Sequence, residues 1–557
     1  MPDGRCHNPG AQEIHGRRKR QTGQPQDIGQ GIKRMAKLSD YTSYADAQRE
    51  FSSAKLWELF DGTLEHFNIA HECIDRYAAD PARVAVRIVR ATGAPEFVTF
   101  REISEQSSKL AHWLIKRGIK KGDRVAFMVE PSKAFYISLF GALKSGAISV
   151  PMFTLFGPDG LKLRVGDCKP ELLIVNEEKL PVAREAIEES KIVLDTDLAE
   201  LIAGEPSTFE YDSKANDLAV FQYTSGTTRD LPAAVKHTHR ALVTLMSAAL
   251  YGTGIRPGDE YFCPSSPAWG HGLWHGTLAP LALGVTTGAF AGKFDAKRLV
   301  EALDEFKITN MSAAATHYRM IRNTGVAEQH KFSFKKLSYT GEPIDPDTLN
   351  YAQGLFKIPI CSMYGTTEIG VILVNYPGAE DYHVKDGSLG KPVPGMQIEV
   401  RRPDGTKAPA NEKNEILLLR KGEWIGTKDL GWTDEDGYFY HGGRADDVII
   451  SAGWTISPVE IEQTLLRHAT VAEAAVIGVP DGLRGLAVKA FIVTKGGNKD
   501  EAHIKELQDF TRHQLSAHEY PRIVEFVDQL IKTPAGKINR KALRDLEARK
   551  AAERTSA

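Results

Sequence analysis

Hydrophobic positions alternate between short runs and helical spacings from about residue 60 onward. An apolar run at 124–129 is followed by a helical pattern at 134–145 and by a second run at 147–151. Short runs rich in β-branched residues that alternate with helical patterns are typical of βαβ units in a mainly parallel sheet. The succession recurs at 171–175, 217–223 and 358–363. The pattern therefore predicts an α/β fold with a large domain of doubly wound sheets.

The pattern changes at 442–447, where a glycine-rich, charged segment leads to a smaller unit. Helices are expected from Pro458 and over 501–515, with strands at 474–477, 488–493 and 523–527. Ser457, Pro458 and Glu460 match a helix start with a capping serine, proline at the first position and glutamate three residues after the cap. We expect an N-terminal domain over 41–445 and a small, hinged α+β domain over 446–557.

Residues 1–40 lack the alternation and are rich in Gln, Gly and basic side chains, with four consecutive basic residues at 17–20. We expect a disordered basic tail without assigned function. A nucleic-acid patch is the less favoured interpretation of the four basic residues. A start at Met35 is an alternative, so whether residues 1–34 belong to the native protein stays open.

The overall charge argues against nucleic acid or an anionic membrane as the main partner. The chain has 70 Lys and Arg against 72 Asp and Glu, a formal charge of -2. Its five cysteines have neither zinc spacing nor a disulfide framework, and no apolar run is long enough to span a membrane or form a secretory signal. We expect a cytoplasmic protein, either monomer or homodimer.

One loop carries an unusual density of hydroxyl groups. Residues 223–228 read Tyr-Thr-Ser-Gly-Thr-Thr and follow the apolar run 218–221. A strand that ends in such a loop can direct hydroxyl and backbone N–H groups at a phosphate chain, and glycine permits close approach. An ordinary surface turn is the alternative for this motif taken alone.

Four further motifs follow this loop in a fixed order. They are Gly341-Glu342-Pro343, the segment 364–368 (Tyr-Gly-Thr-Thr-Glu), the pair of segments 429–434 and 443–447, and 534–540 (Pro-Ala-Gly-Lys-Ile-Asn-Arg). Together the motifs resemble those of the adenylate-forming (AMP-binding) superfamily, over about residues 60–548. They look most like the medium-chain acyl-CoA synthetase group. The resemblance implies an AMP-forming acid:CoA ligase that uses ATP, Mg²⁺ and coenzyme A on a small carboxylic acid.

The resemblance also implies roles for particular residues. In the ATP site, Thr224, Ser225, Gly226, Thr227 and Thr228 hold the β- and γ-phosphates, while Gly341, Glu342 and Pro343 line adenine and ribose. Tyr364 lies against adenine within Tyr364-Gly365-Thr366, Thr367 bonds the α-phosphate, and Glu368 binds Mg²⁺, which prefers oxygen ligands. Asp429 accepts from both ribose hydroxyls, and Arg444 contacts the ribose. Lys537 is the catalytic lysine, with Thr367 beside it, and offsets charge between the carboxylate and the α-phosphate.

The small domain of this superfamily acts in both half-reactions by rotating about a hinge residue. Asp446 matches the hinge, and Gly453 matches a residue that lines the pantetheine tunnel. A tight turn is the alternative role of Gly453. Arg484, Lys489 and Arg522 are candidates for the CoA phosphates, with a solvated surface role as the alternative.

The acyl pocket is expected from segments after the phosphate loop. The candidate lining residues are Trp269, His271, Trp274, Thr316 and His317. Two tryptophans shorten or flatten a cavity, which favours a short- or medium-chain acid, including branched or hydroxylated ones. The histidines either bond a hydroxyl or ketone of the acid or are core and surface residues. An aryl acid such as benzoate stays open.

Three departures from the superfamily pattern affect the expected ATP site. Arg229 replaces the usual glycine, and Ala233 stands roughly where the phosphate-binding lysine belongs, with Arg229, Lys236 or Arg240 as possible substitutes. Thr455 occupies a place that usually holds arginine, and Lys428 one that usually holds glycine. The alternatives to a CoA ligase are an enzyme that loads a free carrier protein and a non-catalytic nucleotide or acyl-CoA sensor.

Overall fold

The computed structural model describes residues 36–556, apart from gaps at 224–233, 367–368, 445–446, 448, 452–453, 482–484, 497–498, 516–518 and 534–535. It confirms the predicted α/β class, with a large mixed α/β region and a smaller α+β region. Leu38–Asp40 form a 3-10 turn, η1, in which Leu38 is buried, although these residues fell in the expected tail. The strand expected at 358–363 begins only at Cys361.

A sheet of thirteen strands forms the centre of the large region. Its spatial order is β16 (Ile398–Arg401), β17 (Asn414–Arg420), β18 (Glu423–Thr433), β19 (Phe439–Arg444), β15 (Ser388–Pro392), β14 (Gly370–Val374), β13 (Cys361–Thr366), β12 (Lys336–Thr340), β11 (Asn310–Ala314), β9 (Tyr261–Phe262), β10 (Thr287–Ala291), β1 (Val84–Arg90) and β2 (Glu96–Thr99). From β13 to β1 in this order, neighbouring strands are parallel to one another. The strands on the other side of β13, and the edge strand β2 beside β1, pair antiparallel. The sequence pattern predicted the parallel part but not the antiparallel extension.

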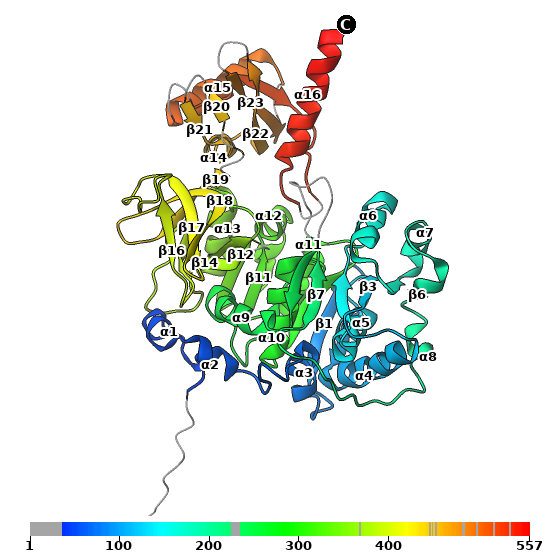
Figure 1. Cartoon of the computed structure of the whole chain (residues 1–557). Coiled ribbons are helices and arrows are strands. Elements are labelled where there is room, and N and C mark those ends of the chain that lie inside the picture. Colours follow the sequence, from blue (N-terminus) through cyan, green and yellow to red (C-terminus); the bar gives the residue numbers. More distant parts are fainter. Residues whose placement is uncertain are drawn as a thin grey trace, which may run out of the picture. The chain divides into compact units, whose positions relative to one another are not determined.

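A second sheet carries the hydroxyl-rich loop. Its order is β6 (Ile192–Leu194), β5 (Leu172–Val175), β3 (Arg124–Met128), β4 (Ile148–Pro151), β7 (Leu218–Gln222) and β8 (Val235–Thr238). Only β7 and β8 pair antiparallel. Helices α4 (Phe100–Lys116) and α5 (Lys133–Ser145) pack against each other, and α5 contacts β3 and β4 (Figure 1). Strands β3, β4 and β5 are almost entirely buried, which explains their continuous apolar runs.

The remaining elements of the large region are mostly short. The α-helices are α1 (Tyr44–Glu50), α2 (Ser53–Trp57), α3 (Ile69–Cys73), α6 (Pro158–Cys168), α7 (Leu180–Arg184), α8 (Leu198–Leu201), α9 (Ala241–Ala248), α10 (Ala279–Ala282), α11 (Ala296–Glu305), α12 (Ala315–Asn323) and α13 (Pro346–Phe356). The 3-10 turns are η2 (Asp75–Tyr77), η3 (Glu177–Lys179), η4 (Glu189–Lys191) and η7 (Ala327–Gln329), and two π-helices are η5 (Ala249–Thr253) and η6 (His271–Leu278). Within the described residues, no helix is long and apolar enough to cross a membrane.

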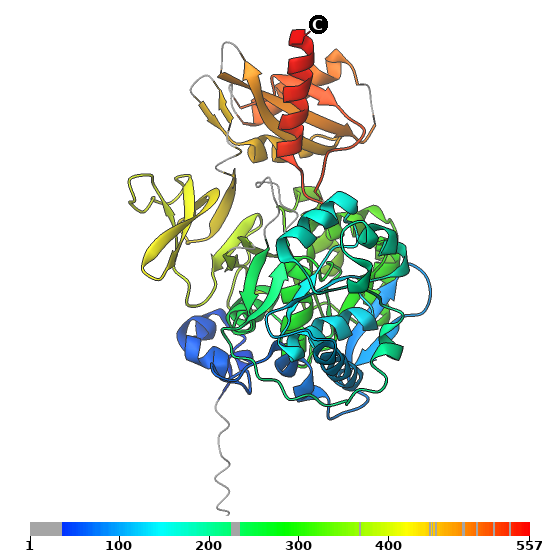
Figure 2. The ribbon, with the colours of Figure 1, turned by 45° about the vertical axis from the view of Figure 1, so that its right-hand side comes forward.

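The C-terminal region has its own sheet and core. The strands are β20 (Ile449–Ser451), β21 (Trp454–Ile456), β22 (Val471–Asp481), β23 (Gly485–Thr494) and β24 (Ile523–Phe526), in the order β21-β20-β23-β22 with β24 also paired to β23. Its helices are α14 (Pro458–Leu466), α15 (Glu501–Gln514) and α16 (Arg540–Ser556). Figure 2 shows α16 lying across β22, where Leu543 joins a buried cluster with Ile477.

The start of α14 differs in detail from the sequence prediction. The helix begins at Pro458 as expected, but Ser457 makes no side-chain capping bond. Its hydroxyl instead donates to the carbonyl oxygen of Gly442 at 2.8 Å. The capping role was therefore wrong, because a carbonyl group of β19 lies within reach of the hydroxyl.

Candidate active site

The hydroxyl-rich loop lies between two paired strands. Strand β7 ends at Gln222, β8 begins at Val235, and these two residues form the last rung of the ladder. Thr224, Ser225, Gly226, Thr227, Thr228, Arg229 and Ala233 lie outside the described residues, so their predicted phosphate contacts stay predictions. Lys236 and Arg240, two candidates to substitute for the missing lysine, are both described and exposed.

The predicted adenine and ribose segments meet at one edge of the central sheet. Gly341, Glu342 and Pro343 directly follow β12, and Tyr364, Gly365 and Thr366 form the end of the parallel neighbour β13. Gly341 has φ +99°, and a β-carbon there would lie 3.1 Å from the Trp269 ring. The positive φ therefore favours glycine at this position, and a β-carbon would also crowd the Trp269 ring.

Tyr364 and Asp429 come together from distant parts of the sequence. The Tyr364 hydroxyl donates to Asp429 Oδ2 at 2.5 Å, and Asp429 is 4% exposed. Asp429 pairs directly with Arg444 across β18 and β19, although the Arg444 side chain is not described. His441 Nε2 lies 3.6 Å from Asp429 Oδ1. A hydrogen bond thus joins two residues that are predicted to bind the nucleotide, and the backbone of a third, Arg444, lies opposite Asp429.

Lys537 lies in a tight turn after Thr533. The Gly536 N–H donates to the Thr533 carbonyl at 2.8 Å, and the Thr533 N–H donates to the Lys537 carbonyl at 2.7 Å. Lys537 Nζ is 5.9 Å from the centre of the Trp269 ring. A β-carbon on Gly341 would lie 3.8 Å from Lys537 Cε. The predicted catalytic lysine, an acyl-pocket tryptophan and the adenine-lining glycine therefore gather at one place.

The predicted acyl-pocket residues divide into two groups. Trp269 precedes the π-helix η6, which contains the buried His271 and Trp274. π-Helices are rare and often occur at functional sites. The indole of Trp274 donates to Gln222 Oε1 at 3.0 Å, and His271 has Ser312 Oγ at 2.8 Å from Nε2 and Ser265 Oγ at 3.1 Å from Nδ1. Both nitrogens of His271 thus have protein partners, which favours its alternative role as a core residue.

Thr316 and His317 lie in the first turn of α12, and a β-carbon on Gly536 would lie 3.7 Å from the Thr316 hydroxyl. The Thr316 hydroxyl donates to Glu342 Oε1 at 2.8 Å, and the guanidinium of Arg319 lies 3.4 Å from the same oxygen. His317 Nδ1 accepts from the Ala314 N–H at 3.2 Å, so it caps the helix start. Sequence reasoning missed Gln222 and Arg319, since a lone Gln or Arg carries no motif.

Four buried histidines near this site are neutral at physiological pH. Burial lowers the pKa of His237, His275 and His317 to about 4, and it lowers the pKa of His271 well below its ordinary value. Because these rings carry no charge near pH 7, they would not form an ion pair with the second carboxylate of a dicarboxylic acid.

The predicted CoA residues differ in their surroundings. Lys489 is buried, with its ammonium 2.6 Å from Glu525 and 2.7 Å from Glu547, so it joins β23 to β24 and α16. We therefore do not retain it as a CoA candidate. Arg522 is exposed and lies 4.0 Å above the Tyr520 ring. Gly453 and Arg484 lie outside the described residues.

The residues on either side of the predicted hinge are partly described. Asp446 is not described, but Asp447 lies 2.9 Å from Arg544 and 3.4 Å from Arg540. Arg540 Nε also donates to the buried Glu462 at 3.1 Å. Asp447 is therefore bound to the start of α16, which directly follows the Lys537 turn.

The metal prediction also rests on undescribed residues. Thr367 and Glu368 lie outside the described part of the chain, so the α-phosphate contact and Mg²⁺ binding remain predictions. Among the described residues, no group of three or more His, Cys, Asp or Glu side chains is arranged to hold a metal ion.

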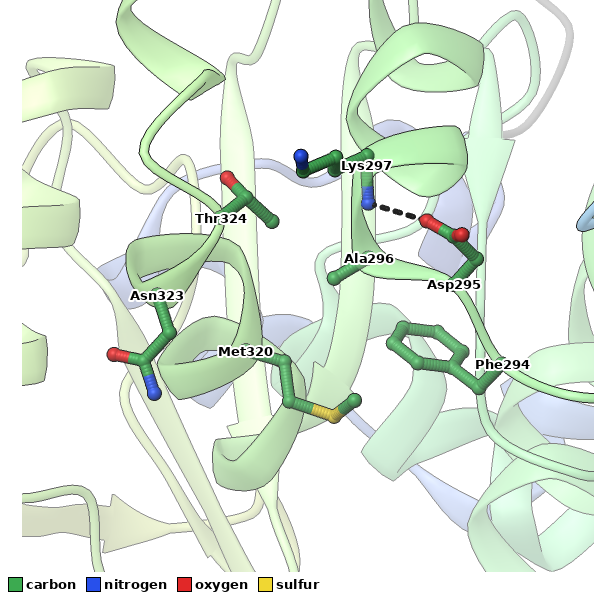
Figure 3. A pocket seen from close by; sticks show the side chains of 7 residues that line it. All are labelled: Phe294, Asp295, Ala296, Lys297, Met320, Asn323 and Thr324. Atoms are coloured by element: carbon green, nitrogen blue, oxygen red, sulfur yellow. Dashed lines mark hydrogen bonds between the residues drawn. The ribbon is translucent and has the colours of Figure 1, made fainter.

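A surface cavity of about 360 Å³ lies beside α12 but is lined by different residues (Figure 3). Phe294 and Met320 approach each other there, and Asp295 caps α11 by accepting from the Lys297 N–H at 2.8 Å. None of its lining residues belongs to the predicted site. A larger cavity of about 810 Å³ lies along β16 and β19 and likewise includes none of them.

The chain belongs to the AMP-binding enzyme family. The family model for AMP-binding enzymes matches residues 74–423, and the model for the C-terminal domain of these enzymes matches residues 460–537. This confirms the adenylate-forming superfamily recognised in the sequence and makes the chain an enzyme of the AMP-forming acyl-CoA synthetase class.

Particular relatives cover nearly the whole chain. Acetyl-coenzyme A synthetase of Bacillus subtilis is 30% identical, over 86% of this chain and 90% of its own length. 4-Hydroxybutyrate–CoA ligase 1 of Metallosphaera sedula is also 30% identical, over 82% and 86%. The crystal structure of the anthranilate CoA ligase AuaEII with anthranoyl-AMP has a TM-score of 0.79 and 27% identity, over 89% of this chain and 99% of that one.

Proposed function

We propose that this enzyme activates a short- or medium-chain monocarboxylic acid, including branched or hydroxylated acids, and transfers the acyl group to coenzyme A. The observation that carries the proposal is the position of Lys537, whose ammonium lies 5.9 Å from the Trp269 ring and beside Gly341. A cation at the junction of the nucleotide and acyl segments suits a reaction that brings a carboxylate to a phosphate.

In the first half-reaction, a carboxylate oxygen attacks the α-phosphorus of ATP and the bond to pyrophosphate breaks. Lys537 offsets the charge that develops between these groups, with Thr367 on the α-phosphate. Asp429 accepts from the ribose hydroxyls beside Tyr364 and Arg444, and the hydrogen bond between Tyr364 and Asp429 supports this grouping. Residues 224–228 hold the departing phosphates, and Glu368 would hold Mg²⁺, which would supply further countercharge when bound.

In the second half-reaction, the CoA thiolate attacks the acyl carbonyl and AMP leaves. We propose that residues 446–557 form a mobile domain that rotates about Asp446 between the two steps, over a large domain at 41–445. Gly453 then lines the path of the thiol, and Arg484 and Arg522 remain candidates for the CoA phosphates.

The proposed acid carries a single carboxylate. Trp269 near Lys537, the buried Trp274 and the neutral buried histidines supply apolar surface and uncharged hydrogen-bonding groups. The cation beside Thr316, Arg319, is already paired with Glu342 and Asp345. Relatives named for acetate and 4-hydroxybutyrate agree with a short acid. An aryl acid is the second candidate, because the flat Trp269 face suits a ring and one structural neighbour acts on anthranilate.

The test is carboxylate-dependent ATP–pyrophosphate exchange with purified enzyme, followed by a thioester assay with CoA. The panel contains linear acids of two to ten carbons, isobutyrate, 4-hydroxybutyrate, benzoate and anthranilate, with succinate as the dicarboxylate control. Exchange with a short or medium acid and little with succinate is expected. If no acid supports exchange, the ligase proposal is wrong, and exchange without CoA thioester would favour a carrier-protein acceptor.

Lys537→Ala tests the role of the lysine. Loss of a cation that stabilises the transition state should lower the exchange rate by about 100-fold or more. Thioester formation from supplied acyl-adenylate should stay within a few-fold of the wild type. Lys505→Ala, at an exposed position in α15, is the control. Equal loss of both half-reactions in Lys537→Ala would contradict its assignment to adenylation.

A further inference from the structure

One carboxylate joins the two residues that flank the hydroxyl-rich loop. Asp167 Oδ2 accepts from the Tyr223 hydroxyl at 2.7 Å and from the Ala234 N–H at 3.1 Å. Tyr223 immediately precedes residues 224–233, and Ala234 immediately follows them. A single oxygen atom therefore connects both ends of this ten-residue segment.

These two hydrogen bonds connect the strands β7 and β8 one residue beyond the end of their backbone ladder. The last β7–β8 rung is Gln222 with Val235, and Tyr223 and Ala234 are the next residues on the two strands. At that point Asp167 binds the side chain of one residue and the backbone of the other. Asp167 therefore fixes the positions of the two flanking residues relative to each other.

The carboxylate is itself held on a packed support. Asp167 lies in the last turn of α6, whose Leu161 and Cys168 are buried with Tyr223 in one hydrophobic cluster. The Arg164 guanidinium lies 3.7 Å above the Phe156 ring and 5.6 Å from the Tyr223 ring. The Arg164 carbonyl oxygen is also 3.1 Å from the Tyr223 hydroxyl.

The tyrosine keeps its proton in this setting. Burial, together with the neighbouring Cys168 and Asp167, raises the pKa of Tyr223. The phenol therefore acts as a donor to the carboxylate throughout the working pH range.

We propose that Asp167 is a positioning residue that holds Tyr223 and Ala234, the two described residues on either side of the predicted phosphate loop, without touching a substrate. The inference rests on the proposed role of residues 224–228 in binding the phosphates of ATP. It identifies a support for a loop that lacks the usual lysine at 233. Loss of Asp167 should therefore raise the KM for ATP and for pyrophosphate, and it should change the KM for the acid little.

The test measures ATP–pyrophosphate exchange for Asp167→Ala, Asp167→Asn and Tyr223→Phe. Asp167→Ala should raise the KM for ATP and for pyrophosphate about tenfold, as expected when hydrogen bonds to a charged group are lost. The KM for the acid should stay within about twofold. Asp167→Asn keeps an acceptor oxygen and should show an intermediate effect.

Two controls separate positioning from general damage. Asp159→Asn removes an exposed carboxylate from the first turn of the same helix and should leave all three KM values unchanged. Thioester formation from supplied acyl-adenylate involves no pyrophosphate and should be normal in Asp167→Ala. The double variant Asp167→Ala/Tyr223→Phe should be little worse than Asp167→Ala, because Asp167→Ala already removes the hydrogen bond that the two residues share.

Two results would overturn the proposal. The first is a KM for ATP in Asp167→Ala that equals the KM for ATP in Asp159→Asn. If Asp167→Ala does not fold, the same comparison is made with Asp167→Asn and Tyr223→Phe. The other is an equal rise in the KM for acid, which would indicate a merely structural role. If the wild-type enzyme catalyses no exchange with any acid, the proposed function itself fails and the role of Asp167 fails with it.

Discussion

Lys428 shows how a single residue can depart from a family pattern at a measurable cost. It precedes Asp429 with φ +62°, in the left-handed region that glycine adopts freely. Its N–H donates to Glu415 Oε1 at 2.8 Å. The glycine usual in this superfamily therefore has a conformational reason, and lysine keeps the same backbone at the expense of strain.

Lys428→Gly should raise the free energy of unfolding by about 0.5–1 kcal/mol, because relief of the left-handed strain exceeds the added freedom of the unfolded chain. Urea denaturation measures the change. Lys428→Ala removes the same side chain without relieving φ and should not stabilise. Equal stabilisation by both variants would show that the side chain, not the backbone, carries the cost.

At the scale of elements, the π-helix η6 depends on close approach to its neighbour. A β-carbon on Gly272 would lie 2.1 Å from the Ser266 carbonyl oxygen and 2.5 Å from that of Ser265. This contact lets the helix present His271 and Trp274 to Ser312 and Gln222.

Gly272→Ala should lower the free energy of unfolding by about 3 kcal/mol, since the clash is with backbone atoms that cannot move aside cheaply. Gly270→Ala, whose β-carbon would lie 3.5 Å from Gln222 Oε1, is the matched control and should be nearly neutral. Urea denaturation with near-UV circular dichroism follows both variants. A neutral Gly272→Ala would mean that this approach is looser than the structure indicates.

The sequence predicted elements with strong periodicity and missed those defined by tertiary contacts. The runs at β3, β4 and β5 were readable because both faces of these strands are buried. The π-helix was not, since its hydrogen-bonding pattern has no distinct periodicity in the sequence. The motifs predicted Tyr364 and Asp429 separately, but their hydrogen bond depends on how β13 and β18 are placed in the fold. The ion pairs of Lys489 could not be predicted from the sequence, because its partners Glu525 and Glu547 come from other elements.

At the scale of the whole molecule, buried histidines link stability to pH. Burial lowers the pKa of His239 to about 3 and that of His275 to about 4, from 6.5. Below pH 6.5 the unfolded chain binds protons at these rings while the folded chain does not. Their contribution to stability is therefore present above pH 6.5 and is lost as the pH falls toward 4.

Urea denaturation at pH 7.5 and pH 5 should show lower stability at the acidic value, by up to about 2 kcal/mol for each such histidine. His239 Nδ1 accepts a hydrogen bond from the Ile69 N–H at 3.1 Å, and asparagine would keep an acceptor there. His239→Asn should therefore reduce the pH dependence of the free energy of unfolding. His513→Gln, at an exposed position in α15, is the control. An unchanged pH dependence in His239→Asn would contradict a neutral buried ring.

The ion pairs of Asp447 stiffen the connection between the proposed hinge and the start of α16. Because Arg540 and Arg544 hold Asp447 to the start of α16, the chain just after residue 446 and the turn that carries Lys537 belong to one stiff body. A change of a few backbone angles at 446 would then move the lysine directly, with little motion absorbed between them. The distance that Lys537 travels is in that case set by the angle of rotation and by its lever arm from the pivot.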